Sequence, residues 1–140
     1  MFKIFGIFNF QRQTVIVCFL RMSPKAFSVE ELQRIISVTS YFHNHLGQQF
    51  TIRQLSRRAA LSEQKFSEGF YQLYGQTVGE YIHHTRMKSS RFLITHTKKS
   101  LKEIAGLCGY SDYKSFLKAY KKYFGLTAGT ERKQNFIRTN

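Results

Sequence analysis

The sequence has only one proline, two cysteines and no tryptophan in its 140 residues. The single proline, Pro24, favours a largely helical globular chain over an all-β sandwich, whose many turns use proline freely. Cys18 and Cys108 are too few for a disulfide framework, and neither belongs to a C-x-x-C pair of the kind that binds zinc or carries out redox chemistry. These scarcities predict an all-α protein that suits a reducing cytoplasm.

Long apolar runs are also missing. No run reaches the roughly 18 residues that a membrane-spanning helix needs, because polar residues 11–13 interrupt the apolar opening stretch. No small-residue cleavage site follows Leu20, so neither membrane insertion nor secretion is expected. Residues 1–24 stay unassigned, with three interpretations open: a buried strand over 14–20, the remnant of a lost upstream domain, or a start codon placed before a true start at Met22.

Acidic residues are few, since eight Asp and Glu stand against 22 Lys and Arg and give a formal net charge of +14. A field of this sign attracts phosphate polymers or anionic membrane surfaces. Residues 51–140 hold 17 of the basic groups and six of the acidic ones, so the charge lies with the helical motifs described below. Nucleic acid is therefore the favoured partner. Membrane-surface binding ranks last, because the helices have the patterning of compact-core helices.

Residue types that serve enzymes and metal sites are present, but their spacing does not form a site. His83 and His84 are adjacent and therefore point apart on a helix, and His43 with His45 is no better placed. The sequence contains no phosphate-cradling glycine loop and no nucleophile elbow. We therefore expect no metal, no cofactor and no catalytic activity.

Helix starts and ends are marked repeatedly from Ser28 onward. A Ser or Thr followed three residues later by Glu or Gln is the capping box, in which two side chains satisfy the free amides of a helix start. The pattern occurs at Ser28/Glu31, Thr51/Gln54, Thr77/Glu80 and Ser100/Glu103. Left-handed glycines that close helices are expected at Gly47, Gly75 and Gly125. The predicted helices are 29–46, 52–59, 63–74, 78–95, 101–107 and 113–124.

Segments 51–75 and 100–125 are two copies of one unit. Each copy contains a short helix, a tight turn and a second amphipathic helix, which is the layout of a helix-turn-helix. The helix over 78–95 would join the copies, and its length of roughly 27 Å would let it hold two reading helices about one DNA turn apart. Small residues stand where the helices of each copy must approach, at Ser56, Ala59, Ala105 and Gly109.

The second copy carries the most specific motif of the chain. It runs from Ser100-Leu101-Lys102-Glu103-Ile104-Ala105 through Gly109-Tyr110-Ser111-Asp112 and Phe116 to Tyr123-Phe124-Gly125. This motif resembles the signature of the AraC/XylS family of bacterial transcription regulators, and the resemblance covers about residues 28–132. Ala128 stands where the family usually has proline, which leaves the small closing helix undecided. Residues 133–140 are interpreted as a basic tail.

The resemblance implies a fold of about seven helices in two helix-turn-helix subdomains joined by a linker helix. It also implies binding of double-stranded DNA as a monomer or weak dimer, and contact with RNA polymerase in activators. Many members carry an effector-sensing domain, for which this chain has no room. The chain would then be either a short member controlled by its abundance or the C-terminal piece of a larger regulator.

If Ser62 and Asp112 cap the two reading helices, the exposed positions that follow face the base edges. Amide, carboxylate and ammonium groups there can pair with adenine, cytosine and guanine respectively, and leucine can meet the thymine methyl group. The base-reading candidates are Gln64, Lys65, Ser67, Glu68, Tyr113, Lys114, Leu117 and Lys118. The phosphate-binding candidates, which position the protein without reading sequence, are Thr51, Arg53, Arg57, Arg86, Lys102, Lys121 and Lys122.

Two functions remain after these observations. The first is a sequence-specific transcription regulator that inserts two recognition helices into successive major grooves. The alternative is a degenerate regulator fragment that binds DNA nonspecifically or acts through a protein partner. Glu68, Ala128 and the unusual first 24 residues motivate this alternative.

Overall fold

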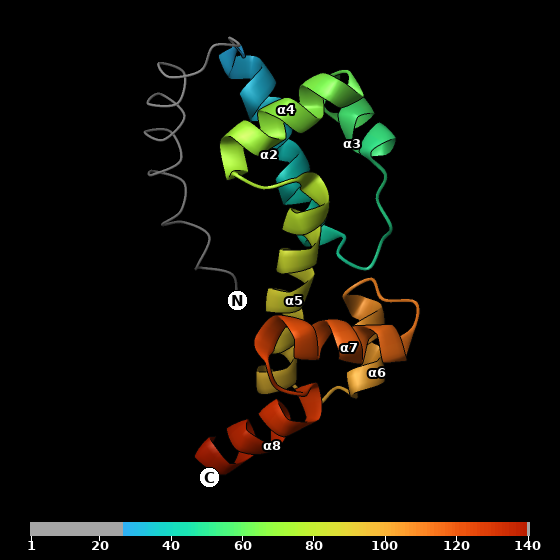
Figure 1. The fold of residues 1–140 in the computed structure, drawn as a ribbon, viewed down its shortest axis with the longest axis vertical. Helices are drawn as coiled ribbons and strands as arrows, with labels where there is room; N and C mark the ends of the chain where they lie inside the picture. The colour runs from blue at the N-terminus through green and yellow to red at the C-terminus, as the bar shows by residue number, and fades with distance from the viewer. Residues whose placement is uncertain (1–26, 140) are drawn as a thin grey trace. The chain divides into compact units, whose positions relative to one another are not determined.

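The computed structural model describes residues 27–139, and α-helices are the only regular secondary structure in that range (Figure 1). The all-α prediction is therefore confirmed. The helices in the described range are α2 (Val29–Asn44), α3 (Ile52–Arg58), α4 (Glu63–Tyr74), α5 (Val78–His96), α6 (Leu101–Leu107), α7 (Tyr113–Phe124) and α8 (Ala128–Thr139). Residues 1–24, for which a buried strand over 14–20 was one of three open interpretations, lie outside the described residues.

Helix boundaries follow the predicted starts closely, but one predicted end is wrong. Gly75 and Gly125 cap α4 and α7 in the left-handed conformation, as expected. Gly47 does not, because α2 already ends at Asn44 and Gly47 has no positive φ. The chain leaves α2 through two turns instead, in which the His45 amide donates to the Phe42 carbonyl at 3.1 Å. The last carbonyls of α2 thus find a partner without a left-handed residue.

The closing helix, undecided from the sequence, is α8. Thr127 begins it, and its hydroxyl oxygen accepts a hydrogen bond from the Thr130 amide at 3.1 Å. Ala128 is fully buried against the hydrophobic core, where its small side chain fits. Residues 133–139, expected as a basic tail, belong to this helix.

The chain divides into two compact units, each built around one helix-turn-helix. Unit 1 comprises residues up to Val38 together with Ile52–Thr77, and unit 2 comprises Thr39–Thr51 together with the chain from Val78 onward. Helix α2 therefore begins in unit 1 and ends in unit 2. The whole of α5, the predicted linker helix, lies within unit 2.

Unit 1 has an apolar core formed by α2, α3 and α4. Gly69 marks the closest approach of α4 to α2, since a Cβ atom added there would lie 2.6 Å from Ile35 Cδ1 and 2.9 Å from the Phe27 ring. Any larger residue at this position would push the two helices apart. The buried apolar residues of the unit are Phe27, Leu32, Ile35, Val38, Leu55, Ala59, Phe66 and Phe70.

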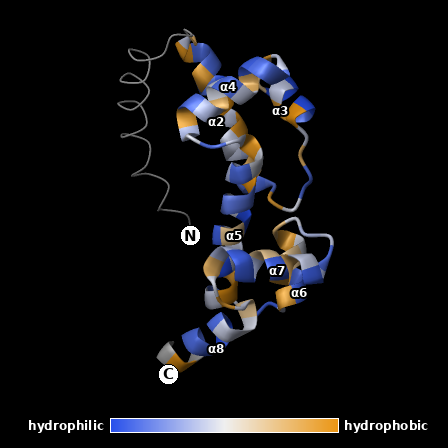
Figure 2. Ribbon diagram, in the orientation of Figure 1, coloured by the Kyte–Doolittle hydropathy of each residue, from blue (hydrophilic) through white to orange (hydrophobic). Residues whose placement is uncertain are grey.

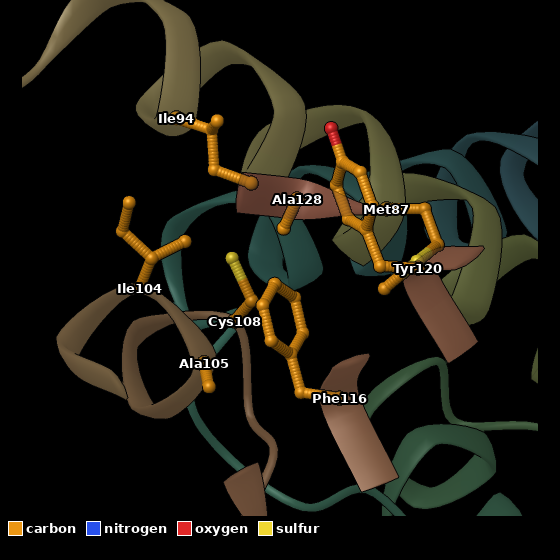
Figure 3. Packing of buried hydrophobic residues seen from close by; sticks show 8 residues of the cluster. All are labelled: Met87, Ile94, Ile104, Ala105, Cys108, Phe116, Tyr120 and Ala128. Atoms are coloured by element: carbon orange, nitrogen blue, oxygen red, sulfur yellow. The ribbon is translucent and has the colours of Figure 1, made fainter. Parts of the chain in front are cut away.

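Unit 2 has its own core, shown in Figure 3, to which α5, α6, α7 and α8 each contribute. Its buried members point toward one another and are Met87, Ile94, Ile104, Ala105, Cys108, Phe116, Tyr120 and Ala128. The helices that supply them carry both hydrophobic and hydrophilic residues (Figure 2), as expected for helices that bury one face. Cys108 is 1% exposed and packs as the small core residue predicted.

We expect Cys108 to resist thiol reagents in the folded protein. Burial raises the pKa of its thiol to about 11, so little thiolate is present at neutral pH, and the sulfur is also shielded. In a Cys18→Ser background, labelling of Cys108 should be slow until denaturant is added. Rapid labelling of the native protein would contradict this packing.

Candidate nucleic-acid interface

The two predicted turns are closed by the same hydrogen bond. In unit 1 the Leu61 amide donates to the Ser56 carbonyl at 3.0 Å, and in unit 2 the Tyr110 amide donates to the Ala105 carbonyl at 2.9 Å. In both copies the bond spans five residues and connects the end of the bracing helix to the chain that leads into the next helix. The internal repeat inferred from the sequence is therefore a repeat of backbone geometry.

Each turn passes through one left-handed residue. This residue is Ala60 in unit 1, with φ of 51°, and Gly109 in unit 2, with φ of 80°. Ala60 is exposed, whereas Gly109 is buried. A Cβ atom on Gly109 would lie 2.5 Å from Arg86 Nη2 and 2.5 Å from the Leu46 carbonyl oxygen, so the second turn demands glycine for space as well as for backbone conformation.

Both reading helices begin at the predicted caps. The Ser62 hydroxyl accepts a hydrogen bond from the Lys65 amide at 3.2 Å at the start of α4. At the start of α7, the Asp112 carboxylate accepts from the Ser115 amide at 2.7 Å and from the Ser115 hydroxyl at 2.6 Å. These hydrogen bonds lower the pKa of Asp112, so its carboxylate is charged at neutral pH. The negative charge interacts favourably with the positive end of the helix dipole.

Two of the base-reading candidates on α7 are lysines with exposed side chains. Lys114 and Lys118 are both exposed and lie four residues apart, so they share one face of the helix. Tyr113 and Leu117 are half-buried and pack against the core of unit 2. Of the four candidates on α7, Lys114 and Lys118 thus share an exposed face, whereas Tyr113 and Leu117 are partly covered by the core.

Helix α4 differs, because its polar candidates are bound to other protein groups. The Gln64 side-chain amide donates to Glu68 Oε1 at 3.0 Å. The Lys65 ammonium contacts Glu31 Oε1 at 2.5 Å in an ion pair with α2. Ser67 is half-buried. The sequence pattern places Glu31 in a capping box and does not indicate its contact with Lys65.

Most phosphate-binding candidates are exposed, as that role requires. Within the described part of the chain, no ion pair occupies the side chains of Arg53, Arg57, Lys102, Lys121 or Lys122. The exposed candidates are Thr51, Arg53, Arg57, Lys102, Lys121 and Lys122. These cations lie on α3, α6 and α7, which are the helices of the two helix-turn-helix units.

Arg86 stands apart from the other phosphate candidates because it is half-buried. Its Nη2 donates to the Gln48 carbonyl at 2.6 Å, and its buried Nε has no hydrogen-bond partner among the described residues. Burial lowers the pKa of the guanidinium group. Beside it, the Gln49 side-chain amide donates to the Gly109 carbonyl at 2.7 Å. Gln49 therefore joins the segment after α2 to the turn of the second copy, and Arg86 joins the same segment to α5. No local sequence pattern indicates either contact.

Positive charge is concentrated in one unit. Ranges 27–38 and 52–77 of unit 1 contain five basic and four acidic residues. Unit 2, over 39–51 and 78–140, contains thirteen basic and four acidic residues. The electrostatic attraction for a polyanion is therefore expected to come mainly from unit 2.

Within residues 27–139, no group of three or more His, Cys, Asp or Glu side chains is arranged to hold a metal ion. His83 instead lies beside Tyr110, with its Nδ1 atom 3.2 Å from the phenolic oxygen. Burial lowers the pKa of His83. None of the helices in that range has the length and apolar character needed to cross a membrane.

Comparison with known proteins gives a family match across both units. A family model described as a helix-turn-helix domain matches residues 55–134. The probable transcriptional regulator LumQ of Photobacterium leiognathi is 28% identical over 123 residues, which cover 86% of this chain and 49% of LumQ. The Msm operon regulatory protein of Streptococcus mutans is 31% identical over 112 residues, covering 80% of this chain and 38% of that protein. The chain thus spans about half the length of these relatives or less.

Solved structures agree on the fold. The DNA-binding domain of AdpA, solved in complex with a target DNA, has a TM-score of 0.71 at 23% identity and covers 75% of this chain and 95% of that one. A regulator with an AraC-type DNA-binding domain from Chromobacterium violaceum has a TM-score of 0.67 at 22% identity, covering 74% and 92%. Together with the family match and the doubled turn geometry, these likenesses show that the chain belongs to the AraC/XylS family of helix-turn-helix transcription regulators.

Proposed function

We propose that this chain binds double-stranded DNA at a particular sequence and regulates transcription there. The observation that carries the proposal is the geometry of α7: its start is capped by Asp112, and Lys114 and Lys118 are exposed on one face within the basic unit 2. In a helix-turn-helix, the first turns of the second helix meet the base edges in the major groove. Lysine there donates to the acceptors of guanine.

The remaining site residues receive roles by the same reasoning. Gln64 would read adenine, and Glu68 would accept a hydrogen bond from the exocyclic amine of cytosine. Lys65 would join them only after leaving Glu31. Ser67, Tyr113 and Leu117 are half-buried and would make shorter contacts at the edge of the interface. The exposed cations of α3, α6 and α7, with Arg53 as the representative of unit 1, would hold the phosphates.

The biological setting follows from the family. We assign the activity to the cytoplasm of a bacterium, where the chain would act as a monomer or weak dimer and, as an activator, would contact RNA polymerase. The relatives named above, LumQ and the Msm operon regulatory protein, come from bacteria. We assign no catalytic activity to the chain.

One observation favours the alternative of a fragment that binds DNA without discrimination. Helix α4 carries Glu63 and Glu68, and its one lysine is engaged by Glu31. Selection of bound sites from random DNA tests both functions, since it reports whether a preferred sequence exists. The affinity for the selected site should exceed that for a scrambled duplex at the same salt concentration. Equal affinities would leave only the alternative.

Two substitutions distinguish a contact with a base from a contact with a phosphate. Lys118→Ala should cost about 1 to 3 kcal/mol on the preferred site and much less on DNA changed at the contacted base pair, because a guanine contact is lost. Arg53→Ala should weaken binding to all sequences about equally and reduce the log–log salt slope by about one, because a phosphate contact carries no base information. Titrations against single-base variants of the selected site measure both effects. A uniform loss with Lys118→Ala would remove the main support for α7 as a base-reading helix.

A further inference from the structure

Glu31 of α2 is held in place by two separate contacts, both within unit 1. Its Oε2 accepts a hydrogen bond from the Ser28 amide at 3.1 Å, and its own amide donates to the Ser28 hydroxyl at 3.2 Å, which completes the predicted capping box. Its Oε1 contacts the Lys65 ammonium at 2.5 Å. Only 16% of the Glu31 side chain is exposed. The capping box thus fixes the carboxylate that faces Lys65.

Lys65 lies in the first turn of the reading helix, where its backbone amide donates to the Ser62 cap. Its side chain is 44% exposed, and its ammonium lies 5.7 Å from the centroid of the Phe27 ring as well as against Glu31. A carboxylate on an ammonium group makes the same kind of charge-assisted pair that a DNA phosphate would make. Glu31 and a phosphate therefore compete for one cation.

The rest of α4 cannot replace that cation. Lys65 is the only lysine or arginine in the sequence of the helix, which also contains Glu63 and Glu68. Helix α7, at the same place in the second copy, contains four lysines and no acidic residue. The two reading helices thus differ in formal charge by five, and the ion pair with Glu31 removes the one attractive charge of α4.

We infer that Glu31 acts as an internal substitute for a DNA phosphate, which withholds Lys65 and so limits the attraction of unit 1 for DNA of any sequence. This inference rests on the proposed function. Sequence-independent attraction supplies most of nonspecific binding. A regulator gains from lowering it, because the nonspecific sites of a genome compete with the operator. Glu31 is therefore a specificity-determining residue that acts through Lys65.

The test compares Glu31→Gln with Glu30→Gln in the full chain. Glutamine also serves in a capping box, so Glu31→Gln keeps the start of α2 while removing the charge that faces Lys65. Glu30 is its exposed neighbour and has the same charge. Fluorescence anisotropy would follow binding of a labelled scrambled duplex over a range of salt concentrations. Circular dichroism would confirm that each variant is folded.

Glu31→Gln should bind the scrambled duplex about three- to tenfold more tightly at 0.1 M salt, with a log–log salt slope steeper by up to about 0.9. Glu30→Gln should gain less than about twofold, because no ion pair joins Glu30 to Lys65 and its attraction to Arg34 is one that Glu31 also exerts. The double variant Glu31→Gln/Lys65→Gln should lose the gain.

Two results would overturn the inference: equal gains from Glu31→Gln and Glu30→Gln, or a gain that persists in the double variant. The proposed function is judged separately, by the ratio of wild-type affinities for the selected and scrambled duplexes. If the wild type prefers the selected duplex but Glu31→Gln and Glu30→Gln gain affinity equally, only the inference about Glu31 is wrong. If the wild type binds both duplexes equally and only Glu31→Gln gains affinity, only the proposed function is wrong.

Discussion

Gly109→Ala is expected to lower the free energy of unfolding by about 2 to 5 kcal/mol. The left-handed backbone at this position would cost an L-residue about 1 to 2 kcal/mol. The added Cβ atom would also meet Arg86 Nη2 and the Leu46 carbonyl oxygen at 2.5 Å each. Arg86 would have to leave Gln48, and each buried polar group left unpaired costs about 1 to 3 kcal/mol. Urea denaturation of the full chain measures the change.

Two other glycines of the same unit separate these contributions. Gly125 has φ of 76° but open space around its Cβ position, so Gly125→Ala should show the backbone cost alone. Gly106 lies inside α6 with open space as well, and Gly106→Ala should be neutral or stabilising by up to about 1 kcal/mol. If Gly109→Ala lowered the free energy of unfolding no more than Gly125→Ala does, the close packing of Arg86 on the second turn would not contribute to stability.

The double substitution Lys114→Gln/Lys118→Gln should lower the affinity for the selected site by about thirtyfold or more. Each guanine contact is worth about 1 to 3 kcal/mol, and about 1.4 kcal/mol corresponds to a factor of ten. Both side chains are exposed and share one face of α7, in the first two turns after the Asp112 cap. Binding titrations on the selected duplex, repeated at several salt concentrations, would measure the loss.

The matched control is Lys88→Gln/Lys133→Gln, which removes the same charge from exposed positions on α5 and α8 of the same unit. Charges that make no contact act only through a field that salt screens, so this control should lose less than about fivefold. An equal loss in both double variants would mean that unit 2 attracts DNA by net charge and that α7 does not read it.

Local features of the fold were predictable because neighbouring residues decide them. The Ser100/Glu103 capping box forms as predicted, with the Ser100 amide donating to the Glu103 carboxylate at 2.7 Å. Residues only three positions apart make these bonds, and their pattern stands in the sequence. The same holds for the left-handed Gly125 at the end of α7. In contrast, the left-handed backbone conformation of Ala60 was not predictable from its residue type, because alanine rarely adopts it. The turn around Ala60 requires this conformation.

Contacts between distant residues were not predictable in this way. No sequence pattern indicates that the Glu131 carboxylate is buried. In the structure it is 7% exposed, accepts a hydrogen bond from the Tyr120 hydroxyl and pairs with Arg91. Burial and this carboxylate raise the pKa of Tyr120. Arg91 is 40 residues away from Glu131, and only the packing of α8 on α5 brings them together.

In the candidate site, too, the features set by neighbouring residues were predictable and those set by distant residues were not. The positions of Lys114 and Lys118 followed from the Asp112 cap and the helical repeat, both of which are local. The engagement of Lys65 did not, because Glu31 lies 34 residues earlier in the chain. Exposure is a property of the folded unit, so the sequence identifies candidate side chains for DNA contact but not which of them are already bound to other protein groups.

The hydrogen bonds of Gln48 with Arg86 and of Gln49 with the second turn limit how the two copies can be exchanged between regulators. A segment that begins at Val78 contains every helix of the second copy, yet it omits Thr39–Thr51 and with it the acceptor for Arg86 and the donor to Gly109. A chimaera built by joining a foreign first half at Val78 would supply these partners from another sequence. The smallest transferable module that keeps the second turn intact is therefore two pieces of chain, Thr39–Thr51 and Val78–Asn140, which must be inherited or engineered together.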